Sequence, residues 1–239
     1  MKNSLKILIA AGVLLFGSLG AYTAGLRAEY ARGTYKDPLR NYNALAFRNF
    51  NQVDVLAASA LNVKIVAGQF GVHVGKDAAE FVRITQQGPR LSVALAYPEK
   101  WKFLGPEDAV IISCPQLLAL ATDGVYSVAG KMRREKTGER CEVTVQGFSQ
   151  DSLTLRQDLA SQVRLVGNTL GRLRAVVGAT PGSASNLTLE DNNRLAASDL
   201  QVAGRGRLVA HNVALPALRW QLGDSARVEL SGRSLMKLR

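Results

Sequence analysis

The chain has 239 residues, of which 47% are hydrophobic and 6% aromatic. This apolar content excludes a wholly disordered chain and suffices for one sizeable domain with an N-terminal appendage. Thirty Lys and Arg against nineteen Asp and Glu give a formal charge of +11, which favours anionic partners such as lipid headgroups, acidic glycans or nucleic acid. Nucleic acid is the weakest of the three, because base stacking needs exposed rings and aromatic residues are few.

The N-terminal segment predicts export. Lys2 and Lys6 precede an uncharged stretch from Ile7 to Leu26, which is long enough to cross a bilayer as a helix. Residues 1–26 are therefore either an uncleaved signal anchor or a cleaved signal peptide. We favour the anchor, because no Ala-x-Ala cleavage site is well placed. A short positive region before a hydrophobic stretch is the usual export signal, so we expect the remainder of the chain to lie outside the cytoplasm.

The rest of the chain divides into a stalk and a β domain. Residues 27–49 are polar and mixed in charge, which is typical of a linker or membrane-proximal stalk. From Phe50 onwards apolar residues alternate with polar ones, and this pattern predicts short strands. Such strands fit a sandwich, a barrel or a solenoid. We favour an all-β solenoid over residues 50–239, because Asp123-Gly124 is the only Asn-Gly or Asp-Gly dipeptide, and tight hairpins prefer those pairs.

An ordered series of short motifs carries a family resemblance. The series runs Phe50-Asn51-Gln52-Val53, Leu61-Asn62-Val63-Lys64-Ile65, Val72-His73-Val74, Leu91-Ser92-Val93-Ala94-Leu95, Val110-Ile111-Ile112-Ser113, Pro115-Gln116-Leu117 and Gly124. It resembles the auto-transporter adhesin, head GIN domain family of bacterial envelope proteins, from roughly Phe50 to Leu230. The resemblance implies a right-handed parallel β-helix-like fold of stacked short strands, exported to the bacterial cell envelope, and it transfers no catalytic residues. The segments Tyr97 to Asp108 and Lys131 to Arg140 depart from the family pattern.

Four arginines lie between inward-facing apolar residues of the predicted strands: Arg164, Arg174, Arg219 and Arg227. Strand alternation sends all four side chains to the outer face. If successive rungs stack in register, these residues form a ladder suited to an anionic glycan, an acidic lipid surface or another envelope protein. The alternative is that they are solvated side chains balanced by nearby Asp and Glu.

Three aromatic residues, Tyr97, Trp101 and Phe103, lie in a segment bracketed by prolines and beside lysines. Such rings suit a sugar platform, a lipid interface or a partner protein. Alternatively, they fold inward and cap an open end of the solenoid, which is the interpretation we favour, because the terminal units of stacked folds need covering.

Cys114 and Cys141 are an even pair in a chain expected to reach an oxidising compartment. They are either a disulfide or two buried free thiols. Two cysteines without a nearby His do not form a metal site, and no cofactor is expected.

The sequence offers little for catalysis. It contains no Gly-x-Ser-x-Gly, no His-Glu-x-x-His and no phosphate-binding loop, the motifs that would mark a common hydrolase or nucleotide site. A β-helical enzyme acting on polysaccharide would need carboxylates from different rungs to converge, for example Glu190, Asp199 and Asp224. We therefore expect a binding or structural module held in a membrane by its N-terminal helix and not an enzyme. The alternatives are that polysaccharide enzyme or a scaffold that pairs with another chain through a strand edge.

Overall fold

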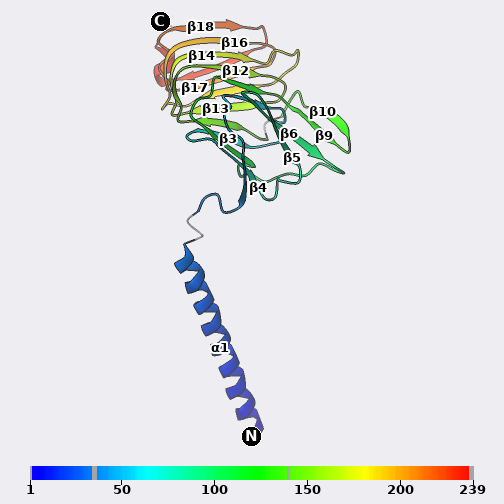
Figure 1. The fold of residues 1–239 in the computed structure, drawn as a ribbon. Helices are drawn as coiled ribbons and strands as arrows, with labels where there is room; N and C mark the ends of the chain where they lie inside the picture. The colour runs from blue at the N-terminus through cyan, green and yellow to red at the C-terminus, as the bar shows by residue number, and fades with distance from the viewer. Residues whose placement is uncertain (1, 34–36, 139, 237–239) are drawn as a thin grey trace. The chain divides into compact units, whose positions relative to one another are not determined.

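The structure is a computed structural model that describes residues 2–33, 37–138 and 140–236 (Figure 1). The chain forms two compact units, Met1–Asn41 and Tyr42–Arg239. The first unit contains one helix, α1 (Lys2–Arg32). This helix continues past Leu26, where the predicted anchor ends, so the beginning of the predicted stalk is helical. Residues 34–36 of that stalk lie outside the described residues.

The second unit is mostly β and contains two large mixed sheets (Figure 1). Sheet A has, in spatial order, β1 (Tyr42–Leu45), β4 (Gly71–Gly75), β7 (Val110–Cys114), β3 (Val63–Ala67), β11 (Val143–Gln146), β13 (Gln162–Val166), β15 (Asn186–Leu189), β17 (Arg207–His211) and β19 (Arg227–Ser231). Sheet B has β10 (Lys131–Arg134), β9 (Val125–Val128), β6 (Arg90–Tyr97), β2 (Gln52–Val55), β8 (Ala119–Thr122), β12 (Ser149–Gln157), β14 (Thr169–Val177), β16 (Arg194–Val202) and β18 (Leu218–Leu222), with β5 (Val82–Gln87) beside β6. A short 3-10 helix, η2 (Gly232–Leu235), follows β19.

From β11 onwards the chain alternates between the two sheets. Each strand pairs in parallel with the strand two places further along, so β11, β13, β15, β17 and β19 are neighbours in sheet A, and β12, β14, β16 and β18 are neighbours in sheet B. One inward column of register partners consists of Val143, Val163, Leu187, Leu208 and Val228. The expectation of a mostly β domain whose inward positions lie in register is therefore confirmed.

The N-terminal part of the β unit departs from the expected all-parallel pairing. Strands β1 and β4, β4 and β7, β5 and β6, and β9 and β10 pair antiparallel. The turn between β9 and β10 is Ala129-Gly130, and both residues have positive φ, 49° and 71°, as a two-residue hairpin turn requires. Asp123-Gly124, a dipeptide that tight hairpins prefer, instead leads from β8 into β9. There a Cβ on Gly124 would lie 2.7 Å from the carbonyl oxygen of Glu135, so close backbone approach explains this glycine.

The inner faces of the sheets enclose one hydrophobic core. Phe50, Ile65, Leu91, Leu120 and Phe148 are among its largest fully buried side chains. Burying a side chain of this size stabilises the fold by about 1.5–3 kcal/mol relative to leaving it exposed. The core contains side chains from both sheets, so the inward apolar side chains of each strand are covered by those of the neighbouring strands.

Two buried asparagines stabilise the corner where the chain passes from sheet A to sheet B. Asn168 precedes β14 and Asn193 precedes β16, and their side chains are 0% and 4% exposed. Asn168 Oδ1 accepts a hydrogen bond from the Phe148 N–H at 3.0 Å, and its Nδ2 donates to Val145 O at 3.0 Å and to Asn193 Oδ1 at 3.1 Å. Asn193 Nδ2 donates to Leu165 O at 2.6 Å. The two amides thus tie backbone groups of successive coils together at this corner.

We predict that Asn168→Ala lowers the free energy of unfolding by about 2–4 kcal/mol, because it leaves the Phe148 N–H buried without its partner and removes the hydrogen bonds to Val145 O and Asn193 Oδ1. The matched control is Asn192→Ala, which removes one hydrogen bond, from the Gly167 N–H at 2.8 Å, at an exposed position. This control should cost less than about 1 kcal/mol. Thermal unfolding of the detergent-solubilised chain, followed by circular dichroism, measures both. Equal losses would contradict a structural role for the buried corner.

Candidate functional site

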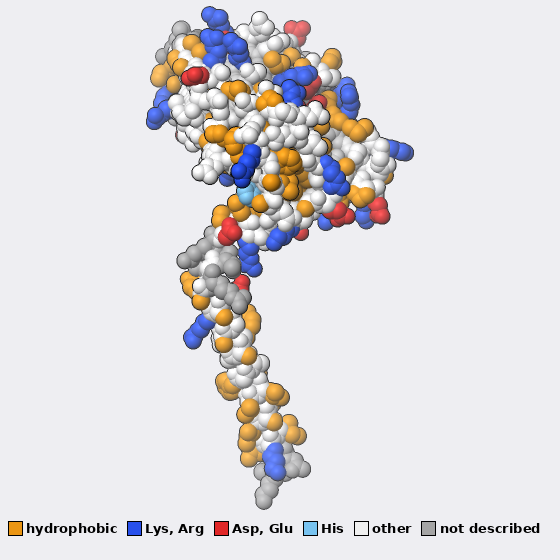
Figure 2. Space-filling view, in the orientation of Figure 1, with side chains coloured by type: hydrophobic (Ala, Val, Ile, Leu, Met, Phe, Trp, Pro, Cys, Tyr) orange, Lys and Arg blue, Asp and Glu red, His pale blue; other side chains and the backbone are white. Residues whose placement is uncertain are grey.

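The outer surface of sheet B carries a cluster of arginines on adjacent strands. Arg172 and Arg174 belong to β14, Asp199 to β16 and Arg219 to β18. We call these four residues the arginine face. They point outward because the residues that alternate with them, such as Leu173, are buried in the core. In Figure 2, Lys and Arg outnumber Asp and Glu over the visible surface of the β unit.

The arginine face has more positive than negative charge. Arg174, Asp199 and Arg219 are register partners on three successive strands. Asp199 Oδ2 lies 3.7 Å from Arg172 Nε and 3.9 Å from Arg174 Nε, and Arg219 has no ion pair within the described part of the chain. The side chains of Arg172 and Arg174 are 49% and 61% exposed. Two guanidinium groups therefore share one carboxylate, the Arg219 guanidinium adds a third positive charge, and all three side chains remain accessible to a ligand.

An open groove of about 400 Å³ crosses this face over β14, β16 and β18. Arg174, Asp199 and Arg219 line it together with Gln201 and Gln221. Guanidinium groups bind carboxylate, phosphate or sulfate through paired hydrogen bonds, and glutamine amides can both donate to and accept from hydroxyl groups. The groove can therefore hold a ligand that carries both anionic groups and hydroxyls.

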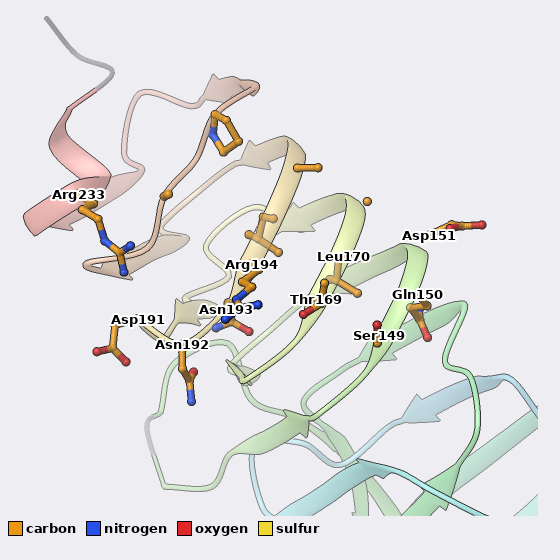
Figure 3. A pocket seen from close by; sticks show the side chains of 15 residues that line it. Ser149, Gln150, Asp151, Thr169, Leu170, Asp191, Asn192, Asn193, Arg194 and Arg233 are labelled. Atoms are coloured by element: carbon orange, nitrogen blue, oxygen red, sulfur yellow. The ribbon is translucent and has the colours of Figure 1, made fainter.

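A second groove, of about 840 Å³, lies along the beginnings of β12, β14 and β16 (Figure 3). Figure 3 shows Asp191 and Asp151 on opposite sides of it, with Arg194 between them. A Cβ on Gly171 would lie 2.7 Å from the Asp151 carbonyl oxygen, so the close approach of β12 requires glycine there. Strands β14 and β16 line both grooves, and the two grooves follow one another along these strands.

Arg164 lies in sheet A and is already engaged by two carboxylates. Its Nε donates to Glu142 Oε1 at 2.8 Å, and its Nη1 donates to Glu190 Oε1. The hydrogen bond to Glu142 is the main cause that raises the pKa of Arg164 above its ordinary value. Arg164 therefore links residues before β11 and after β15, and we assign it a structural role.

The four predicted arginines do not form a single ladder. Arg174 and Arg219 share one column of sheet B, with Asp199 between them. Arg164 and Arg227 lie in sheet A, and they belong to different columns, because Arg227 is the register partner of Arg207. The physical reason for this correction is that consecutive strands enter opposite sheets. Alternation within a strand predicts which side chains face outward but not which sheet presents them.

Gln201 and Gln221 complete the groove but were absent from the predicted site. Each lies two residues after an outward residue of the arginine face, Asp199 or Arg219, and so shares its outward direction. The same alternation would therefore have identified both glutamines.

Tyr97 is a core residue, in agreement with the favoured inward-folding interpretation, and its ring is not at the surface to contact a ligand. It ends β6, its side chain is 1% exposed, and its hydroxyl donates to Lys102 O at 2.8 Å. Its ring contacts Phe81 and Tyr126, with centroids 5.2 and 6.3 Å away. Burial raises the pKa of Tyr97 to about 12. Inward and outward side chains alternate along β6, and Tyr97 takes the inward position at its end. Packing against Phe81 and Tyr126, rather than the adjacent proline, therefore determines where its ring lies.

Trp101 and Phe103 remain on the surface, with 40% and 52% of each residue exposed. Their ring centroids are 6.4 Å apart, and the Arg140 guanidinium lies 5.5 Å from the Trp101 centroid. The structure thus separates the three predicted aromatics into one buried and two exposed.

Cys114 and Cys141 are free, buried thiols, which is the second of the two alternatives that the sequence left open. Cys114 ends β7 and Cys141 precedes β11. Burial raises the pKa of Cys114 to about 12 and that of Cys141 to about 11. Both thiols are therefore protonated at neutral pH.

Comparison with known proteins finds no matching family model and no matching curated protein. Among solved structures, the chain is similar to a putative adhesin from Bacteroides fragilis NCTC 9343, with 10% identity and a TM-score of 0.44 over 80% of this chain and 96% of that chain. It is also similar to a putative adhesin from Parabacteroides distasonis ATCC 8503, with 11% identity and a TM-score of 0.36 over 79% of this chain and 95% of that chain. A putative lipid binding protein from the same organism has 12% identity and a TM-score of 0.32, over 80% of this chain and 94% of that chain. At these TM-scores the likenesses carry no argument about function, and the head GIN assignment stays a prediction.

We predict that the folded chain at pH 8 does not react with a thiol reagent such as Ellman's reagent. The raised pKa values leave little thiolate, on the order of a thousandfold less than in a free cysteine, and burial blocks access. Unfolding without reductant should release two reactive thiols per chain. Thr137→Cys, at an exposed position, is the control that should react at once. Fewer than two thiols after unfolding would show that the cysteines pair.

Proposed function

We propose that this chain is a membrane-anchored protein of the bacterial cell envelope whose exported β unit binds anionic polymers through the arginine face of sheet B. In this proposal the β unit is a right-handed β-helix-like solenoid. The parallel pairing of each strand with the strand two places later supports it, since register partners recur at intervals of roughly 20 to 25 residues, within the range of solenoid repeats. Right-handedness is the rule for parallel crossover connections.

The helix α1 supports the anchored location. The segment Leu5–Ala31 is long and apolar enough to cross a membrane, and none of it is buried in the protein. Ile9, Leu14 and Phe16 are 58%, 74% and 73% exposed. A lipid bilayer would remove these side chains from water, which is favourable by about 1.5–3 kcal/mol for each one.

The observation that carries the binding proposal is that the arginine face sets three guanidinium groups against one carboxylate. Arg174 and Arg219 lie two strands apart, a separation of roughly 9.5 Å, on the walls of one open groove. A ligand whose anionic groups repeat along its length can contact both. Arginine also pairs with carboxylate and phosphate in a fixed planar geometry, which lysine cannot do.

The role that we propose is binding without catalysis. The carboxylates that a polysaccharide-cleaving site would use are dispersed: Glu190 is bound by Arg164, Asp199 lies among the arginines of sheet B, and Asp224 lies in the turn between β18 and β19. Within the described residues, no group of three His, Cys, Asp or Glu could hold a metal ion. These positions support a binding surface over a hydrolytic centre.

We predict that Arg174→Glu/Arg219→Glu weakens binding of polygalacturonate by the full chain in neutral detergent at least tenfold, because it reverses two charges on one groove. Neutral dextran should not bind, and added salt should weaken the wild-type complex by screening. The control Lys131→Glu/Arg133→Glu makes the same change in net charge on β10, where both residues are exposed. This control should change the affinity less than threefold. Equal losses in both double variants would assign the effect to net charge and overturn the site.

We predict that the mature chain retains α1. Membranes from expressing cells should keep the protein after alkaline carbonate extraction, and the intact mass should include residues N-terminal to Ala24. A mature chain that begins near Gly25 and is released by the extraction would establish a cleaved signal peptide instead.

A further inference from the structure

The C-terminal end of the β unit presents open strand edges in both sheets. Among the described residues, β18 has β16 as its single sheet partner, and β19 has β17, so each is the last strand of its sheet. Figure 1 shows β18 at this end of the β unit, beyond β16. The opposite ends of the sheets are formed by antiparallel strands, β1 and β10.

The inward side chains of β18 and β19 are incompletely covered. Leu222 is 47% exposed, and Trp220, Val228 and Leu230 are half-buried. Their register partners on the preceding strands are buried, for example Val202 at 1% and Leu208 at 0%. The helix η2 packs on β17 and β19 but leaves these apolar side chains accessible. Stacked folds need a cover at such an end.

The backbone shows which groups face the open edge. The Arg227 N–H donates to Gly206 O at 2.9 Å, and Ser231 O accepts from the Asn212 N–H at 2.9 Å, so Arg227 and Ser231 bond toward β17. Successive residues of a strand direct their groups to opposite sides. The N–H and C=O of Val228 therefore face the open edge of sheet A. After β18 the Gly223 N–H donates to Val202 O at 2.8 Å, so Gly223 bonds toward β16. By the same rule the backbone N–H and C=O of Trp220, three residues earlier, face the open edge of sheet B.

We propose that a second copy of this chain docks on this end, with its β19 antiparallel to β19 and a twofold axis through Val228. In this register Val228 lies opposite Val228 of the partner subunit and exchanges two backbone hydrogen bonds with it. Arg227 then lies opposite Glu229 of the partner subunit, and Glu229 opposite Arg227 of the partner subunit. These are non-hydrogen-bonded pairs, in which facing side chains are closest.

Charge and register both select this arrangement. A shift of one residue would set inward side chains against outward ones, and centring on Leu230 would place Glu229 opposite serine instead of arginine. Glu229 accepts a hydrogen bond from Arg207 at 2.6 Å, yet its side chain remains 55% exposed and can contact a second arginine. The segment from Leu218 to Ser231 contains two arginines and two acidic residues. This segment, which contains both edge strands, is therefore neutral in a chain of formal charge +11.

The same axis closes sheet B. Trp220 and Val228 are equally distant along the chain from Asp224 in the connecting turn, so an axis perpendicular to both sheets passes near both residues. Trp220 then meets Trp220 of the partner subunit, and Arg219 faces the neutral Gln221 of the partner subunit. Both open edges and the exposed Leu222 are covered together, which is what a stable self-association needs.

A charge-swap series on the full chain in detergent micelles tests this interface, with mass measured by analytical ultracentrifugation. Arg227→Glu and Glu229→Arg each place like charges in both symmetric pairs, and each should weaken self-association about tenfold. Arg227→Glu/Glu229→Arg restores opposite charges and should return the dissociation constant to within about threefold of wild type. Lys131→Glu, on β10, is the control for net charge and should leave self-association unchanged.

A second measurement leaves β18 and β19 unaltered. Trp101→Phe makes Trp220 the single tryptophan of the chain, and its emission should shift to shorter wavelength as protein concentration rises, because docking removes water from the indole. A wild-type chain that stays monomeric, or self-association that persists unchanged in both single variants, would overturn the proposal. So would a double variant as weak as the single ones, or a Trp220 emission that is independent of concentration.

Discussion

Each strand from β11 to β17 forms parallel backbone hydrogen bonds with the strand two places later, and this pairing determines the direction of every side chain in the C-terminal part of the β unit. Because the pairing is in register, apolar positions form continuous columns inside, and polar positions form columns outside. The arginine face exists because Arg174, Asp199 and Arg219 occupy one outer column. The open end exists for the same reason, since parallel pairing leaves the last strand of each sheet with a free edge.

This pairing requires every coil to turn at the same place as the coil before it. Hydrogen bonds from buried polar side chains hold the turns in these places. Asn168 and Asn193 do so at one corner, through hydrogen bonds to backbone groups of neighbouring turns. Asp158 does so at another. Burial alone would raise its pKa, but hydrogen bonds from the Thr180 side chain and backbone and from the Leu159 N–H outweigh burial and lower it. The contribution of Asp158 to stability is therefore present above the pKa of the unfolded state and is lost as the pH falls through the lower, folded pKa.

Local patterns predicted local properties. Alternation identified the strands and the outward direction of Arg164, Arg174, Arg219 and Arg227, and the apolar N-terminal stretch identified a helix. Alternation could not predict which sheet each strand enters, so it could not separate Arg174 and Arg219 from Arg164. The antiparallel pair of β9 and β10 was missed because the turn Ala129-Gly130 reaches positive φ without an Asn or Asp. Local sequence could not separate buried Tyr97 from exposed Trp101 and Phe103, because the environment of Tyr97 depends on Phe81 and Tyr126, which are distant in sequence.

The order of strands in sheet A places β1, the first strand after the N-terminal unit, at one edge and β19 at the other. Inserting or deleting one coil adds or removes one strand in each sheet and changes the separation of these edges by about 4.8 Å. Neither terminal strand is altered by such an event. The length of the β unit can therefore evolve in discrete increments of one coil, while the strands at its two edges keep their own chemistry.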